Sequence, residues 1–127
     1  MNIVDTSGWL EYFAGSSRVK YYEKAVEKTS ELLVPAVCVY EVFKKLLTDY
    51  GEDEALTAIG HMKTGKVIDI DFGISVQAAK ISKEHKIPMA DSIILACGIK
   101  HNAVIYTQDS DFKKMPNVKY FEKRKSA

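Results

Sequence analysis

Short apolar segments alternate with helical segments along this 127-residue chain, and that alternation constrains the fold more than any other feature. The helical segments show apolar residues three or four positions apart, whereas the short segments are continuously apolar. Alternation of this kind predicts an α/β domain of three layers, in which helices cover both faces of a central, mostly parallel sheet. The expected strands are residues 1–5, 31–34, 66–70, 103–106 and 118–121, and the expected helices are residues 6–14, 19–29, 36–50, 53–63, 74–85 and 90–101.

The boundaries of the helices follow from local residue types. Thr6 and Ser7 are hydroxyl residues suited to cap the first helix, and Gly51 ends the longest one. Residues 19–29 have the pattern of one amphipathic helix. The basic residues near the carboxyl end read as a solvated end; they are Lys123, Arg124 and Lys125.

Composition indicates one globular domain over residues 1–127. Hydrophobic residues make up 46% and charged residues 28% of the chain, and the formal net charge is +1. A nucleic acid would therefore have to be held by local lysines, backbone donors or a metal ion rather than by overall charge.

Two features of the sequence indicate the cellular compartment of the protein. Cys38 and Cys97 stand in apolar helical patterns without a CxxC spacing, which predicts buried thiols in a reducing compartment. No apolar run approaches the roughly 18 to 20 residues of a membrane span, and the first residues lack the pattern of an export signal. We expect a cytoplasmic protein without membrane association.

Four acidic residues stand where a strand or helix is expected to begin or end: Asp5, Glu41, Asp91 and Asp109. In open parallel sheets, ligands bind beyond the carboxyl ends of the strands, and Asp5 and the turn at 107–109 are expected at such ends. Together these carboxylates would form an oxygen-rich site suited to a hard divalent cation such as Mg²⁺. That chemistry points to phosphodiester hydrolysis.

Each of these acids also has a structural explanation. Asp5 could cap the first helix, although Thr6 and Ser7 make a further capping group redundant. Glu41 falls off the apolar stripe of its helix, where a solvated glutamate is ordinary. Asp91 stands in a first helical turn, where an acid gains about 0.3 to 1 kcal/mol from the helix dipole.

The segment after the fourth expected strand carries two acids, Asp109 and Asp111. Aspartate is a common turn residue, so a tight strand exit is the structural explanation. We favour Asp109 as the nearer ligand and Asp111 as a supporting residue. The sequence has no Gly-rich phosphate loop and no G-x-S-x-G motif, and His61, His85 and His101 lack metal-ligand spacing.

Taken in order, four segments resemble the motifs of the PIN-domain family, and within it those of the small VapC-type toxins. They are Asp5-Thr6-Ser7 after the first strand, the helix with Glu41, residues 87–96 around Asp91, and residues 107–112 around Asp109. The resemblance covers almost the whole chain. It implies a three-layer α/β/α PIN-like fold, a homodimer, an RNA substrate, and inhibition by a small cognate antitoxin.

The resemblance also assigns roles to the site residues. It implies that Asp5, Glu41, Asp91 and Asp109 bind one or two Mg²⁺ or Mn²⁺ ions, and that Ser7 and Thr107 orient the ligands or a bound water. Gln108 stands where many relatives carry a basic residue. The expected function is that of a metal-dependent ribonuclease, the toxin of a VapBC-type pair.

Several alternatives stay open at this point. A phosphatase of the haloacid dehalogenase type also begins with a strand ending in Asp, but it needs a second Asp where Ser7 stands. A housekeeping RNA-processing nuclease would use the same residues, and a non-catalytic module would bind RNA or protein without cleavage. The exposed faces of residues 19–29 and 53–63 are candidate partner surfaces.

Overall fold

A single sheet of five parallel strands forms the centre of the domain. The computed structural model describes residues 1–123, so Arg124 and Lys125 of the expected basic end lie outside the described residues. Every neighbouring pair of strands is parallel, which confirms the expected sheet and makes it wholly parallel. The strands lie in the order β3-β2-β1-β4-β5; they are β1 (Asn2–Val4), β2 (Leu32–Pro35), β3 (Lys66–Ile68), β4 (Val104–Thr107) and β5 (Val118–Tyr120).

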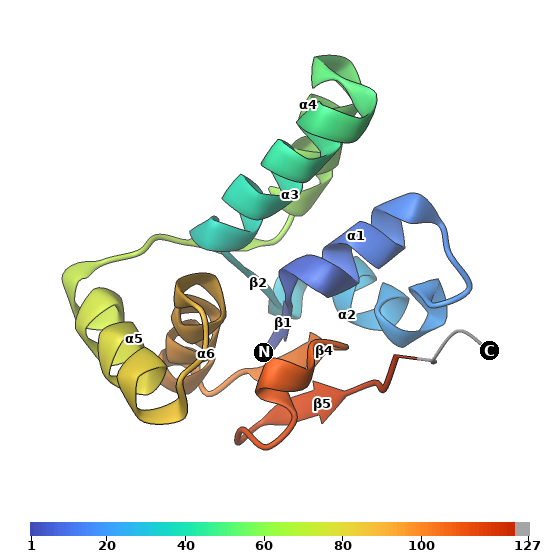
Figure 1. The fold of residues 1–127 in the computed structure, drawn as a ribbon. Coiled ribbons are helices and arrows are strands. Elements are labelled where there is room, and N and C mark those ends of the chain that lie inside the picture. The colour runs from blue at the N-terminus through green and yellow to red at the C-terminus, as the bar shows by residue number, and fades with distance from the viewer. Residues whose placement is uncertain (124–127) are drawn as a thin grey trace.

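Helices cover both faces of this sheet. Figure 1 shows α5 and α6 on one side of the strands and α1 and α2 on the other, with the hairpin of α3 and α4 projecting beyond them. The three-layer α/β/α prediction is therefore confirmed. The helices are α1 (Thr6–Ala14), α2 (Glu23–Glu27), α3 (Ala36–Tyr50), α4 (Glu52–Met62), α5 (Phe72–His85) and α6 (Met89–His101), with short 3₁₀ turns η1 (Val19–Tyr21), η2 (Thr29–Glu31) and η3 (Ser110–Phe112). Within residues 1–123, none of them has the length and apolar character needed to cross a membrane.

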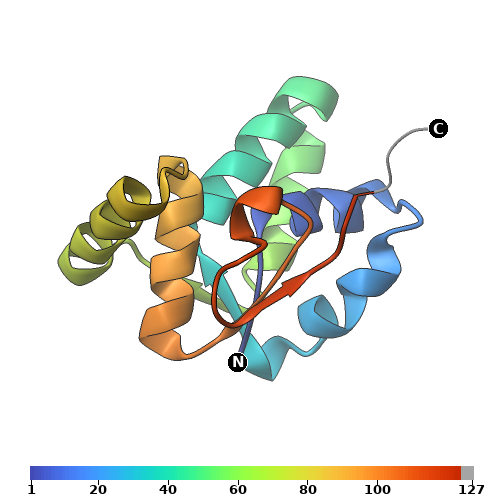
Figure 2. The same cartoon turned by 60° about the horizontal axis from the view of Figure 1, so that its bottom comes forward.

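The strand order reverses direction at β1. From β1 the chain moves outward to β2 and β3, then returns through α5 and α6 to place β4 on the other side of β1. Val4 pairs with Tyr106, and the Asp5 N–H donates to the Tyr106 carbonyl at 3.1 Å. The carboxyl ends of β1 and β4 therefore lie side by side at the switch point, where α/β sheets place their ligands. Figure 2 shows η3 and the exit of β5 at the same end of the sheet as the start of α1.

The core is apolar and closely packed around the two central strands. Ile3, Val4 and Ile105 are buried in the sheet, and Trp9 of α1 is also fully buried. Cys38 and Cys97 are both buried and unpaired, which confirms the prediction made from their apolar surroundings.

Residues 19–29 do not form the single helix that their pattern predicts. They form η1, a break at Tyr22, the short helix α2 and the start of η2. Tyr22 follows η1 with φ −118° and ψ −23°, and Lys28, with φ −83° and ψ 69°, leaves the helical region and ends α2. The Tyr22 ring is fully buried, and a large aromatic side chain contributes more by burial than one helical turn does.

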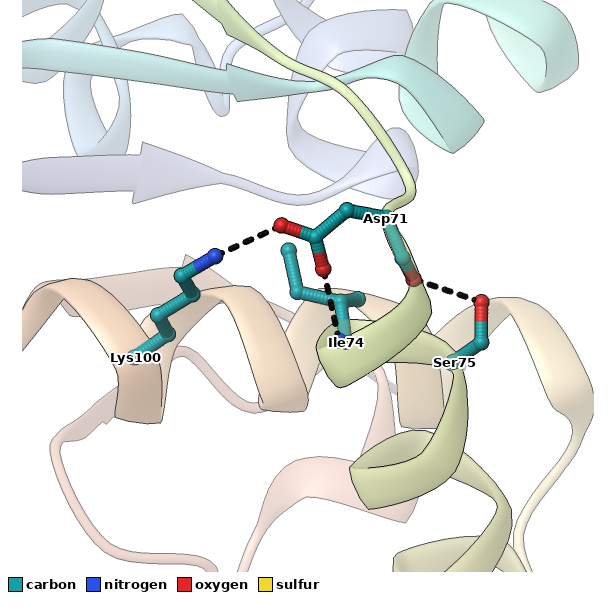
Figure 3. Close-up of polar contacts among 4 residues, drawn as sticks. All are labelled: Asp71, Ile74, Ser75 and Lys100. Atoms are coloured by element: carbon teal, nitrogen blue, oxygen red, sulfur yellow. Dashed lines mark hydrogen bonds and ion pairs between the residues drawn. The ribbon is translucent and has the colours of Figure 1, made fainter.

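The N-terminus of α5 is joined to α6 by Asp71. Its Oδ1 atom accepts a hydrogen bond of 2.8 Å from the Ile74 N–H and so caps α5, while Oδ2 lies 2.7 Å from Nζ of Lys100 on α6 (Figure 3). Ser75 adds a hydrogen bond to the Asp71 carbonyl at 2.8 Å. These contacts hold α5 against α6, the helix that carries Asp91.

Candidate functional site

Three aspartates lie together at the switch point of the sheet. Asp91 comes from the first turn of α6, Asp109 from the turn after β4, and Asp111 from η3. One carboxylate oxygen of each lies within 4.8 Å of those of the others. Asp91 and Asp109 are half-buried and Asp111 is exposed, so the cluster is open to solvent on one side. Asp111, predicted only to support Asp109, is thus as much a part of the cluster as Asp109 itself.

The cluster is electrostatically unfavourable without a cation. The pKa of Asp91 is raised to about 8, first by burial, then by the charge of Asp109 and by the hydrogen bond and charge of Asp111. The charge of Asp5 contributes in the same direction. Carboxylate oxygens are the ligands that Mg²⁺ and Mn²⁺ prefer, and a divalent ion between them would offset this repulsion. The donor set therefore fits the expected metal.

The Asp5 carboxylate accepts hydrogen bonds from α1 and from the end of β4. It is only 2% exposed. Its Oδ1 atom accepts from the Gly8 N–H at 2.9 Å, and its Oδ2 atom accepts from the Thr107 hydroxyl at 2.6 Å. The Ser7 hydroxyl lies 2.8 Å from Oδ1 and 2.9 Å from Oδ2. These hydrogen bonds fix the orientation of the Asp5 carboxylate relative to β1 and β4.

Asp5 is therefore the N-cap of α1, and the expectation that Thr6 and Ser7 fill that role is wrong. The backbone of Asp5 is extended, with φ −73° and ψ 175°, and its side chain meets the N–H three residues on, as N-cap residues do. Thr6 and Ser7 already lie within the helix, where their hydroxyls are directed to other groups. The residue expected to serve the metal site is thus also the N-cap of α1.

Burial raises the pKa of Asp5 to about 6. The hydrogen bonds from Thr107, Gly8 and Ser7 lower this pKa, and the nearby charge of Asp109 raises it. Desolvation is the largest of these effects. The hydrogen bonds stabilise the charged carboxylate, but they do not offset the free-energy cost of burying it. A nearby cation would reduce this cost.

Glu41 lies apart from the aspartate cluster. It is half-buried on α3, and its Oε1 atom accepts a 2.6 Å hydrogen bond from the Thr6 hydroxyl. Thr6 follows Asp5 directly, so Glu41 is tied to the same end of β1. The structure thus joins Asp91, Asp109 and Asp111, places Asp5 near enough for its charge to act on Asp91, and links Glu41 to them through Thr6.

Two further residues of this region escaped prediction. Thr6 was expected to cap a helix, yet it meets a carboxylate 35 positions away. Arg18 donates from Nε to Oε1 of Gln108, 90 positions away, and from Nη2 to the Phe121 carbonyl at 3.2 Å. No local pattern indicates either contact, because each depends on how distant segments meet.

Comparison with known proteins agrees with this geometry. The family model of the PIN domain matches residues 3–118. A toxin-antitoxin complex from Klebsiella pneumoniae superposes with a TM-score of 0.79 at 22% identity, over 96% of this chain and 99% of that one. The DNA-bound VapBC of Salmonella typhimurium gives 0.76 at 15% identity, over 96% and 98%.

A third solved structure has the same fold. VapC20 of Mycobacterium tuberculosis, described as a toxin that cleaves the sarcin-ricin loop, has a TM-score of 0.77 at 18% identity, over 91% of this chain and 95% of that one. At these identities the likeness establishes the fold. No curated protein matches the chain. Because the family model covers nearly the whole domain, this chain belongs to the PIN-domain family.

Proposed function

We propose that this protein is a divalent-metal-dependent ribonuclease that hydrolyses phosphodiester bonds. The observation that carries the proposal is the convergence of Asp91, Asp109 and Asp111 beside the buried Asp5, at the switch point of a parallel sheet. Like-charged carboxylates gathered in this way raise one another's pKa values, and a site of this kind is stable only with protons or a cation present. Solved structures with the same fold include a toxin described as cleaving the sarcin-ricin loop.

In this proposal the three clustered aspartates hold Mg²⁺ or Mn²⁺, and Asp5 and Glu41 complete the acidic set. The bound ion would polarise a phosphate oxygen and lower the pKa of a nearby water. Thr107 and Ser7 keep the Asp5 carboxylate in one orientation, so that little reorganisation is needed during the reaction. In-line attack of water on phosphorus would leave 5′-phosphate and 3′-hydroxyl ends.

We further propose that the protein is the toxin of a VapBC-type pair. The structures with this fold include toxin-antitoxin complexes.

A groove of about 820 Å³ lies between α1, α3 and α4, and apolar and acidic side chains both line it. The lining residues include Leu10, Phe13, Leu46 and Tyr50 together with the acidic Asp53 and Glu54. Asp49 also lines the groove, but it is paired at 3.1 Å with Lys45 of the same lining.

This groove fits an antitoxin segment that carries an apolar side chain flanked by lysine or arginine. The acidic rim would attract the basic residues, and the apolar floor would bury the anchor. The α4 helix, one of the two candidate partner surfaces, forms one wall of the groove. A homodimer and a cytoplasmic location are further parts of the proposal, the latter in keeping with two buried thiols.

The decisive experiment is cleavage of an end-labelled structured RNA by purified protein, with Mn²⁺ and with chelator. Asp5→Asn is the test variant, and Asp69→Asn, at an exposed carboxylate before α5, is the matched control. We expect metal-dependent cleavage by the wild type and the control, and none by Asp5→Asn. Cleavage by Asp5→Asn at the wild-type rate would refute the assignment.

Calorimetry with Mn²⁺ and a growth assay separate the remaining alternatives. A protein that binds RNA but no Mn²⁺ would be a non-catalytic PIN module. A protein that cleaves RNA but whose expression leaves cell growth unchanged would be a processing nuclease rather than a toxin.

A further inference from the structure

A second cavity lies at the exit of β4, the strand that leads to Asp109. It has a volume of about 360 Å³, is open to solvent, and is lined by the loop after α1 and by the chain that leaves β4 and β5. This volume falls in the range of roughly 300 to 1,000 Å³ that ligand pockets occupy. Gln108, which is only 4% exposed, lines it, and the flanking Thr107 and Asp109 belong to the candidate site. The cavity and the acidic site therefore share one strand exit.

Arg18 is fixed in the wall of this cavity. Its Nε donates to Oε1 of Gln108, and its Nη2 donates to the carbonyls of Phe121 and Glu122, each at 3.2 Å. The guanidinium carbon also lies 5.0 Å from the ring centre of Tyr21. A guanidinium restrained from three sides loses little conformational entropy when it binds an anion. Gln108 carries no charge, so Arg18 supplies the positive charge at this strand exit.

The cavity is locally basic. Arg18, Lys20 and Lys123 line it, and none of them forms an ion pair within residues 1–123. Glu11 is the one acidic side chain in the lining, and it accepts a 2.6 Å hydrogen bond from the Ser16 hydroxyl. Three cations against one carboxylate leave a local positive potential next to the acidic cluster.

Asp5 of the candidate site and Arg18 of the cavity both affect the pKa of Tyr22. Burial raises the pKa of Tyr22, and among the smaller effects Asp5 raises it further while Arg18 lowers it. Asp5 and Arg18 therefore both lie near the same phenol. Gln108, which lines the cavity, directly precedes Asp109 in the chain, so the cavity and the acidic site are close to one another.

We propose that this cavity is an RNA subsite, which binds the phosphodiester next to the one that is cleaved, with Arg18 as the positioning residue. The proposal rests on the ribonuclease function above and assigns its backbone contact. The aspartates repel the RNA backbone, and the net charge of +1 provides no general attraction, so a local cationic anchor is needed. Among the described residues Nη1 of Arg18 has no hydrogen-bond partner, so this nitrogen is left to donate to a phosphate oxygen.

The subsite binds the backbone rather than a base. The Tyr21 ring stacks on Phe121 with a centroid distance of 4.6 Å, and the Lys20 ammonium lies 5.4 Å from the centre of the same ring. With Phe121 on one side and two cations over the ring, little open face is left for base stacking. Recognition at this point is therefore tolerant of sequence.

The test is binding of a short dye-labelled single-stranded RNA, measured by fluorescence anisotropy in chelator over a series of salt concentrations. Arg18→Gln is the test variant, and Lys83→Gln, on the exposed side of α5, is the control. We expect Arg18→Gln to weaken binding by about tenfold, as for loss of a hydrogen bond to a charged group. The slope of log K against log salt should fall in magnitude by about 0.7. Lys83→Gln should change neither, and both variants should bind Mn²⁺ like the wild type.

Arg18→Gln binding with wild-type affinity and salt slope would overturn the proposal, as would a wild type that binds no RNA. If circular dichroism shows that Arg18→Gln is unfolded, the double variant Lys20→Gln/Lys123→Gln replaces it, because both of these side chains are exposed. Weaker binding is expected again, with a salt slope smaller in magnitude by about 1.4 for the two charges removed, and an unchanged affinity and slope would be equally decisive. A wild type that never cleaves RNA, with the Arg18 effect intact, would refute the nuclease function and leave the binding site.

Discussion

The Thr107 hydroxyl donates a 2.6 Å hydrogen bond to Oδ2 of Asp5, although 102 positions separate the two residues. The Thr107 hydroxyl oxygen also accepts a hydrogen bond of 2.9 Å from the Asp109 N–H. Thr107 is fully buried at the end of β4, next to the end of β1. One hydroxyl therefore sets the relative positions of two acids that different strands supply.

Replacing Thr107 with valine should remove this link while keeping the shape of the side chain. The partly buried Asp109 N–H would lose its partner, which costs up to about 1 to 3 kcal/mol for an unsatisfied group, and Asp5 would keep only its donors from Gly8 and Ser7. We expect a lower free energy of unfolding in urea and weaker Mn²⁺ binding by calorimetry. Thr57→Val is the control, because Thr57 is exposed and bonds only to a carbonyl of its own helix. Equal effects of the two substitutions would contradict the role given to Thr107.

Stability in the absence of metal should fall as the pH rises from about 4 to about 8. The pKa of Asp91 is about 8 in the folded protein against an ordinary value of 3.8, and that of Asp5 is about 6. Between these values the folded state binds more protons than the unfolded state, so stability decreases with pH. Below pH 4 both states are protonated at these groups and the effect is absent.

Urea unfolding in chelator at several pH values measures this dependence. Asp91→Asn should flatten the fall between about pH 6 and pH 8, since the remaining shift, that of Asp5, ends near pH 6. An Asp91→Asn protein with the same pH profile as the wild type would show that Asp91 is not the group responsible.

Mn²⁺ should bind with release of protons near neutral pH. Asp91, with its pKa of about 8, carries a proton for much of the time at pH 7, and a cation displaces it. Calorimetry in buffers of different ionisation enthalpy measures the released protons, and the apparent affinity should rise with pH up to about 8. Thermal unfolding offers a second readout, because ligand at a hundred times its Kd stabilises by about 2.7 kcal/mol.

One variant inside the aspartate cluster and one outside it test this prediction. Asp109→Asn should lower Mn²⁺ affinity and also lower the pKa of Asp91, because the neighbouring charge is removed. Asp69→Asn should change neither. Binding that takes up protons, or binding that does not depend on pH, would be inconsistent with a site formed by these three aspartates.

The sequence was informative wherever local chemistry decides the structure. The alternation of apolar and helical segments predicted the sheet, and the rule for parallel strands placed Asp5 and residues 107–109 at its ligand-binding edge. Helices with a strong pattern and a clear stop, such as α3 ending at Gly51, have the predicted bounds. These features depend on residues close together in the chain.

Features that depend on tertiary contact escaped prediction. The break at Tyr22 follows from burial of its ring in a core whose other members come from distant segments. The bonds from Thr6 to Glu41 and from Arg18 to Gln108 join segments whose proximity no local pattern reveals. The capping role of Asp5 was set aside because Thr6 and Ser7 looked sufficient, whereas the point at which β1 ends decides which residue stands at the N-cap.

Gly8 offers a sharp test of how the packing of α1 supports Asp5. A Cβ atom at this position would lie 2.6 Å from Cγ1 of Val4 and 2.7 Å from Cε1 of Tyr22, both in the packed core. Gly8→Ala should therefore push α1 away from β1 and disturb the hydrogen bond from the Gly8 N–H to Asp5. Overpacking of this kind typically costs about 1 to 3 kcal/mol.

Gly60→Ala is the matched control for this substitution. Gly60 lies within α4, and a Cβ atom there would have no heavy atom within 4 Å. Alanine is favoured over glycine inside a helix by about 0.5 to 1 kcal/mol, so Gly60→Ala should stabilise the protein. Urea unfolding should thus move in opposite directions for the two variants, and Mn²⁺ affinity should fall only for Gly8→Ala. If Gly8→Ala lowers stability but leaves Mn²⁺ affinity unchanged, the contact between α1 and β1 supports the fold without positioning the acid.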